Sequence, residues 1–103
     1  MNINEKDWKL LRKRLPDWQE NYMKRLNDEY MEILSSDELP STKFWELEKR
    51  INRDKRDTGV MVDDMSRSRM TTIIINLLNE GAITADDLDD FSEELKELMG
   101  RFG

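Results

Sequence analysis

The chain contains neither cysteine nor histidine among its 103 residues. The absence of cysteine excludes disulfide bonds and cysteine-type zinc sites. Without histidine, neither a Ser-His-Asp nor a Cys-His catalytic group can be assembled within the chain. The four glycines lie too far apart to form a glycine-rich phosphate loop. We therefore expect no catalytic residues, no metal site, no cofactor and no enzymatic activity.

Long hydrophobic runs are also missing. The longest uninterrupted apolar stretches are three residues, for example Ile73–Ile75, whereas a membrane-spanning helix needs roughly 18 or more. The N-terminus shows no apolar segment of the kind that marks a secretory signal. We therefore expect no membrane span and a cytoplasmic protein.

The scarcity of glycine and proline favours helices, and the spacing of the apolar residues agrees. Pro16 is expected to end a first helix and start a second, and Ser41 is expected to cap the third. The segment Val60–Val62 fits either a short extended piece or a loop. The sequence thus predicts an all-α fold, a single compact domain over residues 1–103 with four to five helices, at about 5–14, 16–34, 42–56, 63–79 and 85–99.

The last two helices are expected to form a C-terminal antiparallel hairpin. Gly81 stands where a helix-ending glycine belongs, and Thr84 with Asp87 forms a capping-box pattern. A connection of roughly four residues between two helices favours an antiparallel arrangement. The six internal methionines and the three tryptophans (Trp8, Trp18 and Trp45) fit either core packing or an adaptable binding groove.

Charge divides the chain into two parts. Residues 1–59 carry 13 acidic and 13 basic residues, whereas residues 60–103 carry 10 acidic and four basic ones. The net charge of −6 therefore lies wholly in the second part. Seven carboxylates fall on one side of the helix predicted at 85–99, namely Asp86, Asp87, Asp89, Asp90, Glu93, Glu94 and Glu97. They fit either a solvated face or a partner-binding surface that imitates a row of phosphates.

Ser66, Arg67 and Arg69 form a small basic group within the acidic part. At a helix start, such residues can bind an anion, or their arginines can pair with neighbouring carboxylates. The segment also resembles the strand-then-helix opening of ribbon-helix-helix repressors. The resemblance is limited because that family reads DNA with polar or basic residues of the strand, whereas the corresponding stretch here is Val60–Val62 followed by two aspartates. Since no net basic patch is present, nucleic acid is not the expected partner.

Several stretches resemble an uncharacterised family of acidic helical proteins of about this length, from Gram-positive bacteria and their mobile elements. The residues that carry the resemblance are Trp8–Leu11, Leu15–Glu20, Phe44–Glu48, Met65–Ser68, Gly81–Thr84 and Asp87–Leu88. The resemblance implies a bacterial helical protein encoded on a mobile element, and it implies no functional residue.

Three functions follow from these observations. The first is a non-enzymatic protein–protein interaction module, with homodimer formation as one form of that interaction. The second is an acidic, nucleic-acid-mimicking inhibitor of a DNA-binding enzyme, of the anti-restriction or anti-CRISPR type, in which the seven carboxylates bind the partner. The third is a small DNA-binding regulator that uses Arg67 and Arg69.

Overall fold

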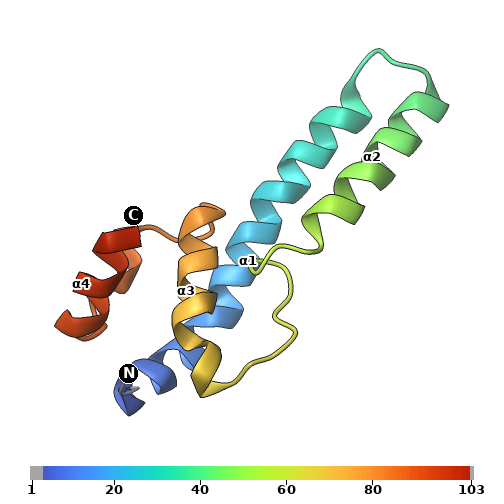
Figure 1. The fold of residues 1–103 in the computed structure, drawn as a ribbon. Coiled ribbons are helices and arrows are strands. Elements are labelled where there is room, and N and C mark those ends of the chain that lie inside the picture. Colours follow the sequence, from blue (N-terminus) through green and yellow to red (C-terminus); the bar gives the residue numbers. More distant parts are fainter. Residues whose placement is uncertain (1–3, 103) are drawn as a thin grey trace.

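The computed structural model describes residues 4–102, and every regular element in that range is helical (Figure 1). The all-α prediction is thus confirmed for this part of the chain. The elements are α1 (Glu5–Ser35), α2 (Pro40–Asp54), the 3-10 helix η1 (Arg67–Arg69), α3 (Met70–Asn79), the 3-10 helix η2 (Ala85–Leu88) and α4 (Glu93–Phe102).

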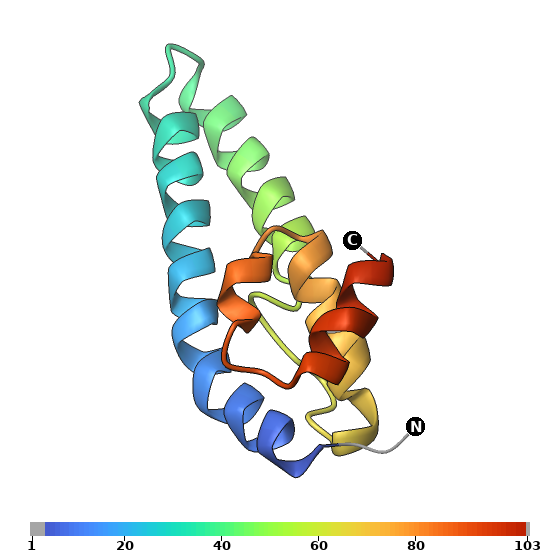
Figure 2. The same ribbon diagram turned by 90° about the vertical axis from the view of Figure 1, so that its left-hand side faces the viewer.

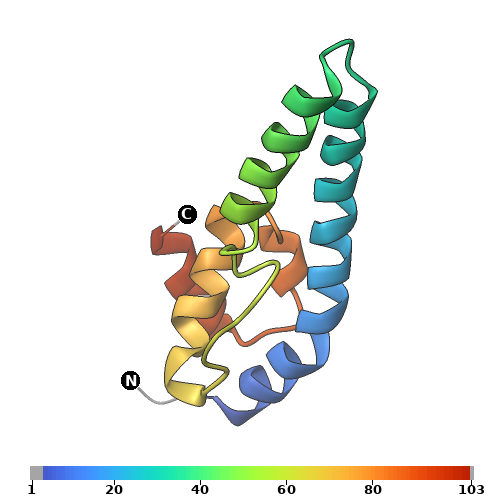
Figure 3. The same cartoon turned by 90° about the vertical axis from the view of Figure 1, so that its right-hand side faces the viewer.

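Helix α1 is continuous where two helices were expected. Its first turn is capped by Asn4, whose side chain accepts a hydrogen bond from the Lys6 backbone N–H at 2.9 Å. Pro16 lies inside the helix, where it removes one backbone hydrogen bond. The helix bends in this region (Figures 2 and 3) but does not end. The predicted break was wrong because buried residues before the proline, such as Leu11, and after it, such as Trp18, hold both halves against the same core.

Helix α2 folds back along the second half of α1, and the two form a hairpin that projects from the rest of the molecule (Figure 1). Pro40 occupies the first helical turn after Leu39 as N-cap, so the predicted cap at Ser41 was wrong. Proline is favoured there because its fixed φ suits the first turn. The molecule measures 53 × 24 × 23 Å with a radius of gyration of 16.3 Å. A compact domain of this length has about 13 Å, so the chain is elongated rather than compact.

A loop of residues 55–66 connects α2 to η1, and it contains no strand. The Glu80 side chain accepts hydrogen bonds from the backbone N–H groups of Thr58 at 2.8 Å and Gly59 at 2.9 Å. Gly59 lies against the Tyr22 ring, which leaves no room for a Cβ atom. The helix predicted at 63–79 is shorter in the structure: residues 63–66 belong to this loop, Arg67–Arg69 form η1, and α3 spans Met70–Asn79.

Gly81 ends α3 as predicted. It has a φ of +74°, a conformation that glycine adopts without steric cost. Its N–H donates to the Leu78 carbonyl at 3.1 Å, and the Ala82 N–H donates to the Leu77 carbonyl at 2.9 Å. These two bonds form a Schellman motif, and Ile83 is buried directly after it.

The helix predicted over residues 85–99 is broken. The capping box of Thr84 and Asp87 is present, but it starts only the short η2. The new helix α4 begins after Ser92, whose Oγ accepts a hydrogen bond from the Leu95 N–H at 3.2 Å. Ser92 in turn donates its backbone N–H and its hydroxyl to the buried Asp7 carboxylate, at 2.9 and 2.6 Å. This contact across the fold breaks the expected helix, so the predicted C-terminal hairpin of two helices stays unconfirmed.

The core lies between the first half of α1 and the elements after residue 69 (Figure 2). Its most deeply buried side chains are Leu11, Ile74 and Leu77. Around them pack Trp8, Leu15, Trp18, Met70, Ile73, Ile83, Leu88, Phe91, Leu95 and Met99. No residue of α2 belongs to this cluster, so the hairpin extends beyond the core that α1 shares with α3 and α4.

Candidate interaction surface

The seven carboxylates expected on one helix face are divided between three segments. Asp86 and Asp87 belong to η2, Asp89 and Asp90 to the turn after it, and Glu93, Glu94 and Glu97 to α4. The prediction of one acidic helix face was wrong because Ser92 starts a new helix in the middle of the series.

Three of these carboxylates make bonds within the fold. Asp87 caps η2, and Glu93 pairs with Lys96 at 2.9 Å. Asp90 accepts a hydrogen bond from Arg14 of α1 at 2.7 Å. Three of the seven carboxylates therefore have a role in contacts within the fold. A partner-binding role for the seven residues stays a prediction.

The basic group before α3 is also engaged. The Arg67 guanidinium donates to both carboxylate oxygens of Glu5, at 2.7 and 3.4 Å, which joins η1 to the first turn of α1. The Ser66 and Ser68 hydroxyls lie 3.3 Å apart, and Arg69 is exposed. The group precedes both η1 and α3, whose N-cap residues are Ser66 and Arg69, but neither side chain makes a capping hydrogen bond. The anion-binding hypothesis for Ser66, Arg67 and Arg69 therefore gains no support.

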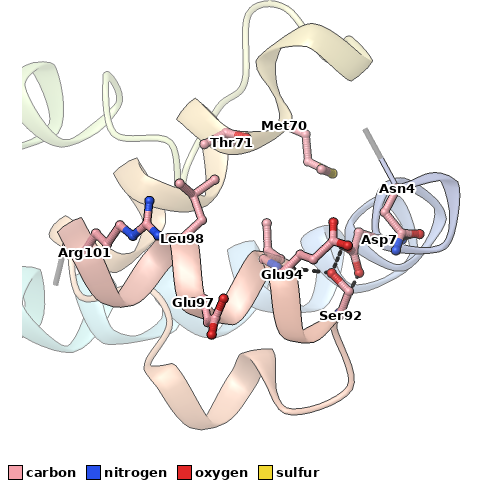
Figure 4. Close-up of a pocket in the computed structure, with 10 residues that line it drawn as sticks. Asn4, Asp7, Met70, Thr71, Ser92, Glu94, Glu97, Leu98 and Arg101 are labelled. Atoms are coloured by element: carbon pink, nitrogen blue, oxygen red, sulfur yellow. Dashed lines mark hydrogen bonds between the residues drawn. The ribbon is translucent and has the colours of Figure 1, made fainter. Parts of the chain in front are cut away.

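A pocket of about 220 Å³ lies between the start of α1, α3 and α4 (Figure 4). It is smaller than most ligand sites, which run from roughly 300 to 1,000 Å³. Asp7 and Ser92 lie at one end and Arg101 at the other (Figure 4). The Ser92 hydroxyl donates to Asp7 and accepts from the Leu95 N–H, so it serves as a helix cap. The geometry indicates a structural junction.

Within residues 4–102, no group of three side chains is arranged to hold a metal ion. In the same range, no helix combines the length and the apolar character that crossing a bilayer requires.

The most distinctive surface is the outer part of the α1–α2 hairpin. Six large apolar side chains are exposed there: Met31, Leu34, Leu39, Phe44, Trp45 and Ile51. We call these six residues the hairpin surface. Leu39 is 68% exposed, Trp45 63% and Phe44 62%, whereas Trp8 and Trp18 are buried in the core. The Phe44 and Trp45 rings contact each other edge to face at 5.0 Å. Large groups of exposed apolar side chains mark interaction sites.

Polar bonds hold the hairpin together. Asp54 is the only buried residue of α2. Its carboxylate accepts hydrogen bonds from the Tyr30 hydroxyl at 2.7 Å, from Arg53 at 3.1 Å and from Arg50 at 3.3 Å. Arg50 also donates to Glu29 at 2.7 Å and lies over the Tyr30 ring, 5.7 Å from its centre. We call these five residues the hairpin network. Because it fixes α2 against α1, the hairpin surface is not needed for that contact.

Burial and hydrogen bonds shift the pKa values of Tyr30 and Asp54 in the hairpin network, and of Tyr22 nearby on α1. Burial and the hydrogen bond to Asp54 raise the pKa of Tyr30 to about 12. Burial and a 2.5 Å hydrogen bond to Asp57 raise the pKa of Tyr22 even further above its ordinary value. Burial alone would raise the pKa of Asp54, but the hydrogen bonds from Tyr30 and Arg53 outweigh it and hold that pKa below its ordinary value. The fold thus favours neutral tyrosines and an ionised Asp54.

These shifts predict a loss of stability in alkali. Because the pKa of Tyr30 rises from 10.0 to about 12, its contribution is complete below pH 10 and lost as the pH rises toward 12. Urea unfolding at several pH values between 9 and 12 measures this loss. A Tyr30→Phe variant, which cannot ionise, should lose less stability than the native chain over that interval. An equal pH dependence in both proteins would contradict the assignment.

The positions of the charged residues in α2 indicate which side of this helix is exposed, whereas the spacing of its apolar residues alone does not. Phe44, Leu47 and Ile51 recur at spacings of three and four residues, which predicts one apolar seam on the third helix. A second stripe, with spacings of four, three and four residues, runs beside this seam and consists of Lys43, Leu47, Arg50 and Asp54. That stripe faces α1 through the hairpin network, and Phe44 and Ile51 are left exposed.

Comparison of the chain with protein-family models, with curated proteins and with solved structures gives no match. The resemblance to acidic proteins of Gram-positive bacteria therefore stays a prediction. The function has to be inferred from the geometry of the chain itself.

Proposed function

We propose that this protein is a non-enzymatic protein-interaction module that binds its partner through the hairpin surface. The observation that carries the proposal is the group of six large, exposed apolar side chains on one projecting hairpin. Tryptophan is enriched among the residues that dominate binding energies, and Trp45 is the tryptophan that the fold leaves outside its core.

The exposure of this surface is not explained by the folding of the chain. The hairpin network already attaches α2 to α1, and the core is completed by α3, η2 and α4. Leaving such side chains in water costs free energy, roughly 25 cal/mol for each Å² of apolar surface. Covering them with a partner recovers that free energy, which supports an interaction role.

The two alternatives are supported less well. An acidic mimic of nucleic acid would need the carboxylates of η2 and α4 in a continuous row, but the turn at residues 89–92 interrupts them. A DNA-binding regulator would need Arg67, whose guanidinium pairs with Glu5. The hairpin surface is therefore the better candidate.

Affinity capture from a bacterial lysate with matched variants tests the proposal. A Phe44→Ser/Trp45→Ser chain should lose the retained protein at least about tenfold, a change of about 1.4 kcal/mol. An Asp86→Lys/Glu97→Lys chain is the control, because it changes the acidic group and leaves the hairpin intact. The control should retain the partner, and retention should persist at high salt. Retention by the hairpin variant with loss in the acidic variant would overturn the proposal in favour of the mimic.

A further inference from the structure

A second exposed apolar feature lies at the base of the hairpin. A groove of about 410 Å³ runs between α1 and the loop that follows α2. It is lined by Arg12, Leu15, Pro16, Gln19, Val60, Met61, Val62 and Met65. Met61 is 55% exposed and Met65 37%. With the hairpin surface, these two methionines complete the set of large, exposed apolar side chains in the described part of the chain.

The groove and the hairpin surface lie on the same side of α1. Pro16 lines the groove and Leu34 belongs to the hairpin surface, and they are 18 residues apart. At 3.6 residues per turn this separation is five complete turns, which returns to the same face. On α2, Phe44 and Ile51 are seven residues apart, close to two turns, and likewise share a face. The side of α1 that carries Pro16 and Leu34 thus has the groove at one end and, at the other, the turn of residues 36–39 between α1 and α2, which we call the tip.

Charged residues also differ between the tip of the hairpin and its base. The tip carries the exposed acidic residues Asp37 and Glu38, whereas Lys55 and Arg56 are exposed near the base, and Arg12 lines the groove. Within residues 4–102, Asp37, Glu38, Lys55 and Arg56 form no ion pair with one another or with other residues. Asp63 and Asp64 are also exposed at the base, between the groove-lining residues Val62 and Met65. The charge complementarity is therefore between the acidic tip and three cations, Arg12 in the groove and the exposed Lys55 and Arg56.

We propose that the partner of the hairpin is a second copy of this chain. The two hairpins pack antiparallel about a two-fold axis, so that the tip of each copy lies in the groove of the other. The inference rests on the proposed function and identifies its partner. In an antiparallel pair, both tips and both grooves are occupied. No free site is left for a third copy, so the assembly stops at the dimer.

The available surface matches the requirement for such a dimer. Eight side chains between 37% and 68% exposed offer roughly 100 Å² each. One copy thus presents about 800 Å² of apolar surface, and a pair buries about 1,600 Å², the size of a standard stable interface.

Sedimentation equilibrium across a concentration series tests the dimer. The native chain should show twice its 12.4 kDa mass at the higher concentrations. Arg12→Glu and Glu38→Lys should each raise the dissociation constant about tenfold, and the two together should restore it, because the charges exchange places. A monomer at all concentrations, or no recovery in the double variant, would overturn the inference.

Cysteine cross-linking tests the antiparallel register, since the chain has no cysteine of its own. Because the tip of one copy lies in the groove of the other, residue 38 of one copy should lie near residue 12 of its partner. A mixture of Arg12→Cys and Glu38→Cys chains should therefore form a disulfide-linked dimer on mild oxidation, because a disulfide needs Cα atoms about 4.4–6.8 Å apart. A mixture of Arg12→Cys and Glu46→Cys chains, in which the second cysteine is exposed on α2 away from the tip, is the control and should stay monomeric.

The outcomes separate this inference from the proposed function. Equal cross-linking in both mixtures, or none between positions 12 and 38, would overturn the antiparallel dimer. A monomeric chain that still captures a different protein through Phe44 and Trp45 would overturn the dimer and leave the interaction module standing. A dimer unaffected by Phe44→Ser/Trp45→Ser would overturn both, because neither then depends on the hairpin surface.

Discussion

Replacing Asp54 by alanine is expected to lower the free energy of unfolding by about 3–5 kcal/mol, the usual cost of removing one partner from a buried charged group. Asp54 is the only buried residue of α2 and accepts hydrogen bonds from Tyr30, Arg50 and Arg53. Without its carboxylate, the Tyr30 hydroxyl loses its acceptor, and the half-buried Arg50 keeps only Glu29. We therefore expect α2 to separate from α1.

Urea unfolding gives the size of this effect, and amide hydrogen exchange shows where it occurs. Exchange should accelerate in residues 40–54 more than in the core helix α3. Arg53→Ala is the matched control: its side chain is 69% exposed, so the loss should be at most about 1 kcal/mol. The difference between Asp54→Ala and the native chain should shrink as the pH falls below 3.8, the ordinary pKa of aspartate. Equal losses for the two variants would contradict the role of the hairpin network.

Replacing Asp7 by alanine is expected to cost about 3 kcal/mol, because it removes two hydrogen bonds to a buried charged group. The Asp7 carboxylate accepts the Ser92 backbone N–H at 2.9 Å and the Ser92 hydroxyl at 2.6 Å. These bonds attach the beginning of α4 to the first turn of α1. Their loss should allow residues 89–92 to rearrange toward the continuous helix that the sequence alone predicts.

Thermal unfolding by circular dichroism measures the cost, and the backbone chemical shifts of residues 89–92 report the rearrangement. Asp7→Asn is the control, because its amide oxygen keeps one acceptor and should therefore lose less stability. Glu94→Ala, an exposed change in the same pocket, should alter stability by no more than about 0.5 kcal/mol. A stable Asp7→Ala chain with an unchanged turn would contradict this explanation of the broken helix.

Local sequence signals predicted much of the fold. Trp8, Leu11 and Leu15 repeat with helical spacing and are buried together. Gly81 ends α3 with the expected motif, and Thr84 with Asp87 forms the expected capping box. These features depend on neighbours within one or two turns, which is the range that periodicity and capping rules describe.

The errors have a common physical origin in contacts between distant segments. Pro16 did not end a helix, because the core holds both halves of α1. The helix over residues 85–99 was broken by Asp7, which lies 85 residues before Ser92 in the sequence. Neither contact can be read from the local pattern.

The candidate site was missed for a related reason. The sequence pointed to the acidic residues after position 85, and Phe44 was assigned to an apolar seam. Which side of α2 faces α1 is decided by Tyr30, Arg50 and Asp54 together, and Tyr30 belongs to another helix. The exposure of Phe44 and Trp45 follows only once that pairing is known.

Fluorine NMR of the chain labelled with fluorotryptophan tests the central claim most directly. The three tryptophans give three signals, and a Trp45→Phe variant assigns the one from the hairpin surface. As a partner is added, whether a second copy or another protein, the Trp45 signal should shift while those of Trp8 and Trp18, which are buried in the core, stay in place. An unchanged Trp45 signal in a chain that is demonstrably bound would contradict the assignment of the hairpin as the interaction surface.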